Sequence, residues 1–338
     1  MSTKNFRKLI KGTVEYVLKN LENNYILIGE NTSGKSELLF SIMRKMTENS
    51  KIDQIYFIDS VNRSFHLDAI SGFQKEKKEY DYREICAMRL EERTFNKMDS
   101  FGLAKIESIY WMYEDKLKAL VQDFFGLQID IKIGEQENTP INIPARLEII
   151  KGDYVFTEDH ENLNMPNGMQ AVFRIFLELL FLNDNVNRIT DTDEKNIVCI
   201  EELDLYLSEK YSAEIFNFIR KAFPNFVFIV STHSRALTVT AKETNVIAIK
   251  GTEKWIVNSG ENYELDVEEL FADIFYTEET LMHTNDDRID RKLRVLLNNK
   301  ITGDWCEMDS KMLEEIHKEE LKPHQVFLRE EIERWDRE

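Results

Sequence analysis

The chain has 338 residues, of which 42% are hydrophobic, and a formal net charge of −18. This length and apolar content can supply a large folded core, so they exclude a wholly disordered chain. The acidic balance disfavours a surface built mainly for nucleic acid, because phosphate binding depends on lysine and arginine; it still leaves room for a local basic groove.

Targeting and redox signals are sparse. No apolar run approaches the ~20 residues that a membrane helix needs, and "MSTKNFRKLIKG" lacks a signal-peptide core. Cys86, Cys199 and Cys306 lie far apart and show no zinc spacing, as expected of reduced thiols. We therefore expect a cytoplasmic protein that does not engage a membrane.

Helix and strand patterns alternate along most of the chain. Helical patterns cover 6–21, 36–46, 168–182 and 208–223, and apolar strand patterns cover 24–29, 54–59, 196–202, 225–234, 245–250 and 254–258. Between them lie a charged, mostly helical insertion at about 65–125 and short strands within 129–156. Strands that alternate with helices, several apolar on both faces, predict an α/β domain with a mixed, largely parallel sheet.

The last part of the chain has a different pattern. From about residue 266 the sequence is acidic, and apolar residues recur at helical spacing in 286–299 and 323–335. Pro323 suits the first turn of a helix. We predict one domain over 1–265 and an acidic helical C-terminal region over 266–338.

A glycine-bounded loop follows the first strand. Its residues fit G-x-x-x-x-G-K-[ST]: Gly29, Glu30, Asn31, Thr32, Ser33, Gly34, Lys35 and Ser36. The glycines let the backbone approach phosphate oxygens, and successive N–H groups with the following helix N-terminus form an anion nest. Lys35 would reach the β- and γ-phosphates of ATP, and the Ser36 hydroxyl would hold Mg²⁺. An accidental glycine-rich turn is the alternative.

Two acids end the apolar strand "NIVCIEE". The carboxyl ends of parallel strands are where ligands bind in such sheets. Successive strand residues face opposite ways, so we expect Glu201 to orient the Mg²⁺ shell and Glu202 to polarise the attacking water. The alternative is a pair of solvated acids that begins a loop.

A histidine ends the next strand, "FIVSTHS". At that place His233 could donate a hydrogen bond to the γ-phosphate and distinguish ATP from ADP. A lone histidine is otherwise most often a surface or satisfied core residue.

The order "GENTSGKS", helical insertion, "VCIEE", "STHS" resembles an ABC-type ATPase domain over residues 20–250. It is most similar to the soluble branch of RecF-like, SMC-like and OLD-family ATPases, which includes ATPase subunits of anti-phage systems such as Septu. The resemblance implies a P-loop NTPase fold, the cofactors ATP and Mg²⁺, and a homodimer or higher even oligomer with composite ATP sites.

In that family a signature loop before the apolar helix touches the nucleotide of the opposite subunit. The matching segment here is "LNMPNGMQAVFRIF", in which Gly168 and Gln170 fit. The usual serine is missing: Pro166 and Asn167 lie where it would fall, and Asn167 could still donate a hydrogen bond. The resemblance therefore assigns Asn167 and Gly168 to the nucleotide of the partner, and Asp204 to a loop that contacts the partner. An ordinary helix start is the alternative for this segment.

Two features of the family have no clear counterpart. Phe6, Tyr16 and Tyr25 are the candidates for stacking on adenine, and the segment "YFIDSVNRSF" lacks the glutamine that joins the Mg²⁺ shell. That segment offers Asp59, Asn62 and Arg63 instead, and the sequence does not assign the role.

Several functions fit these motifs. The first is an ATPase that dimerises around ATP and controls a separately encoded effector, a nuclease or toxin, in anti-phage defence. The alternative is a RecF-like repair or chromosome-handling ATPase that binds DNA directly through cations in "FQKEKKEY" and "EICAMRLEERTFNK"; both runs carry matching acids, so the charge does not indicate nucleic acid. A transporter subunit or a small-molecule kinase fits less well.

Overall fold

The computed structural model describes residues 3–48, 54–70, 79–91, 101, 105–132, 146–151, 154–156, 165–186, 195–250, 253–260, 263, 266–267, 270–271, 274, 285–302, 305–318 and 321–334. The chain forms two compact units, Met1–Phe275 and Tyr276–Glu338. The sequence places the boundary at 265/266. Val267, Leu270 and Ile274 belong to the core of the first unit, so the unit boundary follows them.

A six-stranded sheet forms the centre of the first unit, in the order β2-β6-β7-β1-β8-β9. The strands are β1 (Asn24–Gly29), β2 (Ile55–Ile58), β6 (Asn196–Ile200), β7 (Phe226–Ser231), β8 (Thr244–Lys250) and β9 (Glu253–Val257). Every neighbouring pair is parallel except β8 with β9. The predicted mixed, largely parallel sheet is thus confirmed.

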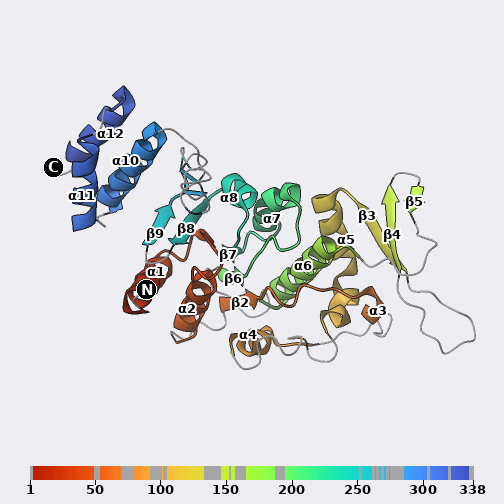
Figure 1. Ribbon diagram of the computed structural model, residues 1–338. Helices are drawn as coiled ribbons and strands as arrows, with labels where there is room; N and C mark the ends of the chain where they lie inside the picture. The colour runs from red at the N-terminus through yellow and green to blue at the C-terminus, as the bar shows by residue number, and fades with distance from the viewer. Residues whose placement is uncertain are drawn as a thin grey trace, which may run out of the picture. The chain divides into compact units, whose positions relative to one another are not determined.

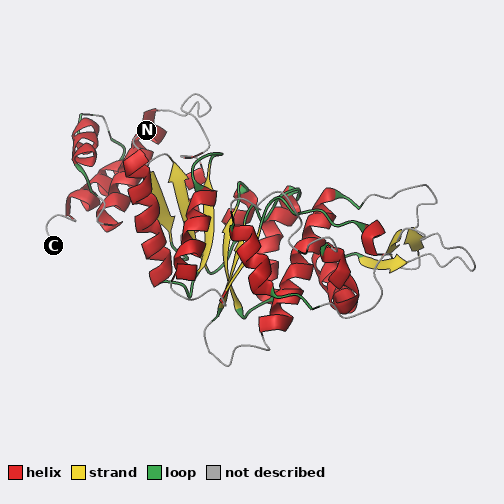
Figure 2. Cartoon of the chain, turned by 90° about the horizontal axis from the view of Figure 1, so that it is seen from below, coloured by secondary structure: helices red, strands yellow, loops and turns green. Residues whose placement is uncertain are grey.

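Helices cover this sheet, as parallel sheets require (Figures 1 and 2). They are α1 (Thr3–Lys19), α2 (Lys35–Glu48), α7 (Glu209–Ala222) and α8 (Arg235–Thr240). Helix α2 packs against β1 and β7, and α1 packs against α2. Strands β2, β6 and β7 are buried along their whole length, which explains their continuous apolar runs.

The predicted helical insertion follows β2. It contains α3 (Leu67–Ile70), α4 (Tyr82–Leu90), the 3-10 helix η3 (Ile106–Ile109) and α5 (Tyr110–Phe125). The short strands β3 (Gln128–Lys132), β4 (Arg146–Lys151) and β5 (Tyr154–Phe156) then pair antiparallel in a separate three-stranded sheet. The long apolar helix α6 (Asn167–Val186) packs against α5 and β2.

The second unit contains α10 (Asn285–Thr302), α11 (Glu307–Ile316) and α12 (Pro323–Arg334). Its core residues are Ile289, Leu293, Leu296, Ile316 and Ile332. Helix α12 begins at Pro323 as the sequence predicts. In the ranges that the structure describes, no helix of either unit combines the length and apolarity that crossing a bilayer requires.

The sheet order decides where the sequence motifs meet. Strands β2, β6, β7 and β1 are consecutive and parallel, so their carboxyl ends lie side by side at one edge. The segments that leave this edge start at residues 59, 201, 232 and 30. These segments contain Glu201 and Glu202, His233 and the glycine-bounded loop.

Candidate functional site

The loop between β1 and α2 is built on two glycines that no other residue could replace without strain. Gly29 and Gly34 have φ of 153° and 105°, in the region that favours glycine. A Cβ on Gly29 would lie 2.5 Å from the Ile249 carbonyl oxygen, and one on Gly34 would lie 2.5 Å from Phe6 Cζ. Thr32, also at positive φ, lies with Glu30 and Asn31 on the exposed rim. The predicted phosphate loop therefore has the tight, open geometry that its motif requires.

Lys35 points back into this loop. Its Nζ donates to the carbonyl oxygens of Gly29 at 2.9 Å and Glu30 at 3.0 Å. Burial lowers the pKa of Lys35, and the nearby carboxylates of Glu202 and Glu201 oppose this shift. The ammonium group thus lies inside the loop, held by backbone oxygens that it can exchange for those of an anion.

Ser36 and Glu201, 165 residues apart in sequence, are in direct contact. The Ser36 hydroxyl donates to Glu201 Oε1 at 2.6 Å, and the Ser60 hydroxyl donates to Oε2 at 2.8 Å. Hydroxyl and carboxylate oxygens are ligands that suit Mg²⁺. The donor set therefore fits the predicted metal: the structure brings Ser36 and Glu201 into contact and adds Ser60.

Glu202 leaves the strand where the backbone turns sharply. Its φ is 49°, a conformation that non-glycine residues seldom adopt and that clusters at functional sites. Its N–H donates to Ser231 Oγ at 2.9 Å, and the Leu203 N–H donates to the Ser231 carbonyl at 3.0 Å. The turn buries Glu201 and leaves Glu202 half-buried. The two acids therefore occupy different environments, and the turn that follows β6, not the alternation of strand residues, separates them.

His233 lies at the same edge, one residue after Thr232. Burial and the Lys35 ammonium hold the pKa of His233 below its ordinary value, against the opposing carboxylates of Glu202 and Asp204. Asp204 is anchored beside it, because the Thr232 hydroxyl donates to Asp204 Oδ1 and also accepts from the Ser234 N–H. The structure therefore brings Lys35, Glu202 and His233 into one electrostatic neighbourhood, with the histidine neutral near pH 7.

Of the three aromatic candidates for stacking on a base, Phe6 lies against the loop, with its ring in contact with Gly34. A groove of about 850 Å³ runs between α1 and α2 from Thr32 and Gly34, and its lining includes Phe6, Ile10 and Val14. Tyr25 cannot serve, because it is fully buried and its hydroxyl donates to the Asn20 carbonyl. Tyr16 donates to Asn258.

Asn167 and Gly168 begin α6. Gly168 lies against the Tyr206 carbonyl, where a Cβ would come within 2.7 Å, and Asn167 is exposed. Gln170, the other residue of the predicted signature segment, accepts from the Phe65 N–H at 3.2 Å and donates to the Met165 carbonyl at 2.6 Å. These contacts order the start of α6 within the chain and leave its first residue accessible.

Sequence reasoning missed one residue of this edge, Ser60, and named Arg63 without a role. Both lie in the segment after β2, for which the sequence offered Asp59, Asn62 and Arg63 in place of the expected glutamine and assigned none of them. Arg63 Nη2 donates to the Glu201 carbonyl. The available signal was positional, because Ser60 follows a buried strand whose carboxyl end lies beside that of β6.

At this edge a buried strand leads into a glycine-bounded loop that ends in Lys-Ser, and the loop leads into a helix. Acids and a histidine from neighbouring strands lie at the same edge. This arrangement defines a P-loop nucleotide-binding domain of the α/β class.

No family model matches the chain. It is 33% identical over 76 residues to the Retron Ec83 probable ATPase of Escherichia coli; the match spans 22% of this chain and 14% of that protein. Among solved structures, an SMC head bound to the C-winged helix domain of ScpA shares 12% identity, with a TM-score of 0.34, and the match covers 72% of this chain and 92% of that one. The SMC head domain from Thermotoga maritima shares 15% identity, with a TM-score of 0.29, over 47% of this chain and 56% of that one.

Proposed function

We propose that this chain binds ATP with Mg²⁺ at the sheet edge and hydrolyses it in a homodimer or higher even oligomer. The observation that carries the proposal is the 2.6 Å contact between the Ser36 hydroxyl and the Glu201 carboxylate. It joins the end of the phosphate loop to the acidic strand end, which is the ligand pair that a P-loop offers to Mg²⁺.

Each polar residue at the edge has a role that follows from its contacts. When bound, Mg·ATP supplies a polarised γ-phosphoryl group for attack by water. Ser36, Glu201 and Ser60 would hold the metal, and Lys35 would transfer its N–H donors from the Gly29 and Glu30 carbonyls to phosphate oxygens. The N–H groups of the loop and the N-terminus of α2 would stabilise negative charge.

Glu202 is the residue that we assign to the attacking water. Its carboxylate is half-buried beside Lys35 and His233, where it can orient a water and accept its proton. Neutral His233 can donate one N–H toward the γ-phosphate position. Phe6 and the groove between α1 and α2 would take the base and ribose, because an apolar face there adjoins the loop.

The second half of the composite site would come from the partner. Asn167 is exposed at the start of α6, and a helix N-terminus offers unpaired N–H groups to an anion. We assign Asn167 and Gly168 to the nucleotide of the opposite subunit.

Glu202→Gln tests hydrolysis directly. We expect this variant to bind ATP and to accumulate as ATP-bound dimers, with turnover reduced by about 10²–10⁴-fold, the typical contribution of a general base. Steady-state phosphate release and light scattering after size exclusion measure the two effects. Glu209→Gln, an exposed acid in the first turn of α7, is the matched control. Normal turnover in Glu202→Gln would remove Glu202 from this role.

We also propose that ATP turnover by this chain controls a separately encoded nuclease or toxin that acts in anti-phage defence. The resemblance of the motif set to ATPase subunits of anti-phage systems supports this proposal, whereas the short match to the Retron Ec83 probable ATPase supports ATP hydrolysis. Phage plating on cells that carry this gene with its neighbours should differ between the wild type and Lys35→Ala. Equal plating efficiency would contradict the defence role while leaving ATP hydrolysis untouched.

Direct DNA binding gains no support from the described part of the insertion. Residues 71–78 and 92–100, which contain most of the basic runs, lie outside the described residues. Arg89, the last arginine of α4, is 3% exposed and is therefore not available to a phosphate backbone.

A further inference from the structure

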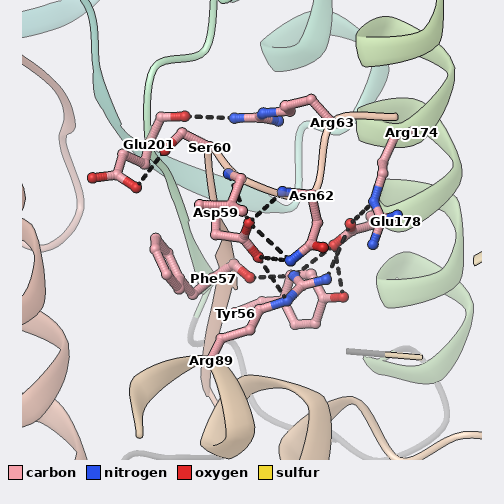
Figure 3. A network of polar contacts seen from close by, with 11 residues as sticks. Tyr56, Phe57, Asp59, Ser60, Asn62, Arg63, Arg89, Arg174, Glu178 and Glu201 are labelled. Atoms are coloured by element: carbon pink, nitrogen blue, oxygen red, sulfur yellow. Dashed lines mark hydrogen bonds and ion pairs between the residues drawn. The ribbon is translucent and has the colours of Figure 1, made fainter. Parts of the chain in front are cut away.

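Ionisable side chains meet in the interior beside the candidate site. They come from three separate segments, and each is at most 3% exposed: Asp59 and Arg63 after β2, Arg89 on α4, and Arg174 and Glu178 on α6. Figure 3 shows these side chains converging between the end of β2 and the two helices. We call this group the buried network.

Glu178 is the centre of the buried network. Its carboxylate accepts from Arg89 Nη1 at 2.7 Å and Nη2 at 3.1 Å, from Arg174 Nε at 3.1 Å, and from the Tyr56 hydroxyl at 2.9 Å. Such bidentate, charge-assisted contacts are strong and directional. Glu178 thus joins α6 to α4 and to β2 at one point.

Arg89 continues the network toward the sheet edge. Its Nε lies 3.3 Å from Asp59 Oδ2, and Asp59 Oδ1 accepts from the N–H groups of Val61 at 2.9 Å and Asn62 at 2.7 Å. Although burial works to raise it, Arg89 and the Asn62 N–H hold the pKa of Asp59 below its ordinary value. An ionised Asp59 therefore shapes the turn after β2, and Arg89 fixes Asp59.

This turn presents two side chains to Glu201. The Ser60 hydroxyl donates to the Glu201 carboxylate at 2.8 Å, and the Arg63 guanidinium donates to the Glu201 carbonyl (Figure 3). The other carboxylate oxygen of Glu201 accepts from Ser36 of the phosphate loop. A continuous chain of contacts therefore runs from α6 and α4 to Glu201, the acid that we assign to Mg²⁺.

Charge within the buried network is not balanced. Within it three guanidinium groups face two carboxylates, and Asp204, outside the network, also attracts Arg63. Arg63 Nε and Nη1 are buried without a hydrogen-bond partner in the part of the chain that the structure describes. Burial lowers the pKa of Arg63 to about 10, against the attraction of Asp59 and Glu178. A network that served stability alone would satisfy these N–H groups, because buried donors without partners are costly. Arg63 lies next to the segment that would bind metal and phosphate.

We propose that Arg63 is a positioning residue that holds the Glu201 main chain in place for magnesium, and that the chain Glu178–Arg89–Asp59 makes this position depend on α4 and α6. The inference rests on the proposed Mg·ATP site and adds the way in which it is regulated. A partner that moves α4 or α6 changes the metal affinity of a site that it does not touch. Outer residues that orient metal ligands commonly alter metal affinity by about 10–100-fold when removed.

The experiment compares nucleotide affinity with and without Mg²⁺, using a fluorescent ATP analogue. In Arg63→Gln we expect about a tenfold or greater rise in the Mg²⁺ concentration needed for half of the affinity gain. Affinity in EDTA should change little, because Lys35 and the loop are intact. A purely structural role would instead lower the thermal midpoint and the affinity in both conditions together.

A second variant tests the remote part of the chain of contacts. Arg89→Met with Glu178→Gln removes one charge of each sign, so it leaves the net charge of the buried network unchanged, although Asp59 and Arg174 each lose one partner. This double variant decides the test if Arg63→Gln does not fold. We expect the same rise in Mg²⁺ requirement. Arg83→Met is the matched control, because Arg83 lies on the same helix and its carboxylate partner is Asp81 at the start of α4, at 2.9 Å.

The outcomes separate this inference from the function on which it rests. If Lys35→Ala retains nucleotide affinity, the proposed site itself is wrong. If Lys35→Ala loses affinity while Arg63→Gln and the double variant keep the wild-type Mg²⁺ requirement, the site stands and the positioning role of Arg63 is overturned.

Discussion

The sheet-edge site and the buried network hold similar charged groups in different ways. At the edge, Lys35 donates to two backbone carbonyls, and Glu202 and His233 are half-buried. In the buried network, Glu178 and Arg89 bind each other's side chains away from solvent. A cation held by backbone oxygens, or a side chain that is partly exposed, can change partners when a ligand binds. Paired buried charges cannot do so without a large desolvation cost. The first region is suited to chemistry and the second to position.

Their pKa values differ for the same reason. Burial lowers the pKa of Lys35, because Glu202 and Glu201 only partly offset it. Burial also acts to lower the pKa of Arg89, but Glu178 and the other anionic partners overcome it and raise that pKa well above its ordinary value. The edge therefore has in Lys35 an under-compensated cation that an anion would satisfy, whereas Arg89 in the buried network is already satisfied.

The largest expected effect is at the edge. Lys35→Ala should abolish measurable ATP binding, because the residue supplies the cation that faces the β- and γ-phosphates. The thermal midpoint should stay near that of the wild type, since the hydrogen bonds that the ammonium group makes to described residues go to the backbone carbonyls of Gly29 and Glu30. Isothermal titration and a thermal melt measure the two. Lys221→Ala, an exposed lysine in the last turn of α7, is the control, and undiminished affinity in Lys35→Ala would sink the assignment.

The second largest expected effect is a loss of folding stability when the buried network is broken. Glu178→Ala leaves Arg89 and Arg174 without their shared carboxylate, and removal of one partner of a buried ion pair typically costs about 3–5 kcal/mol. Urea unfolding followed by circular dichroism measures this loss. Lys45→Ala is the control, because Lys45 pairs with Glu48 at 2.9 Å and is 53% exposed, and exposed pairs contribute about 0–1 kcal/mol. Equal losses in the two variants would erase the distinction between network and surface pairs.

The edge was predictable because its residues belong to short contiguous motifs. "GENTSGKS", "VCIEE" and "STHS" each sit at the end of an apolar strand, and parallel strands bring those ends together. The two acids also lie in different environments, as expected, but a turn with a positive φ at Glu202, which the sequence did not show, separates them in place of strand alternation. The fold class and its elements follow from the same periodicity.

The buried network was not predictable, because its contacts join distant segments. Arg89 contacts Glu178, 89 residues away, and a charged helix pattern does not show which arginine lies inside. A serine after a strand is also too common a residue to mark Ser60 as a contact of Glu201, 141 residues away. The pairing of β3, β4 and β5 in a sheet of their own likewise depends on tertiary contacts.

The smallest expected effect separates the two regions by pH. In the free protein, burial and Lys35 hold the pKa of His233 below its ordinary value, so the folded state binds fewer protons than the unfolded state just below pH 6.5. A bound anion favours the charged imidazole and raises that pKa. ATP binding should then take up protons, and affinity should rise as pH falls from 7.5 to 6.

If ATP raises the pKa of His233 by about one unit, the ATP affinity rises by at most about tenfold over this pH range. The ionisation of ATP itself affects the wild type and His233→Asn equally, and the variant lacks the imidazole. The difference between the two pH profiles of affinity therefore isolates His233. Asp59 and Arg89 of the buried network do not titrate in this window, because the pKa of Asp59 is lowered and that of Arg89 is raised. Identical affinity profiles for the wild type and His233→Asn would show that His233 does not face the bound phosphate, and would confine the chemistry of the edge to Lys35 and the two glutamates.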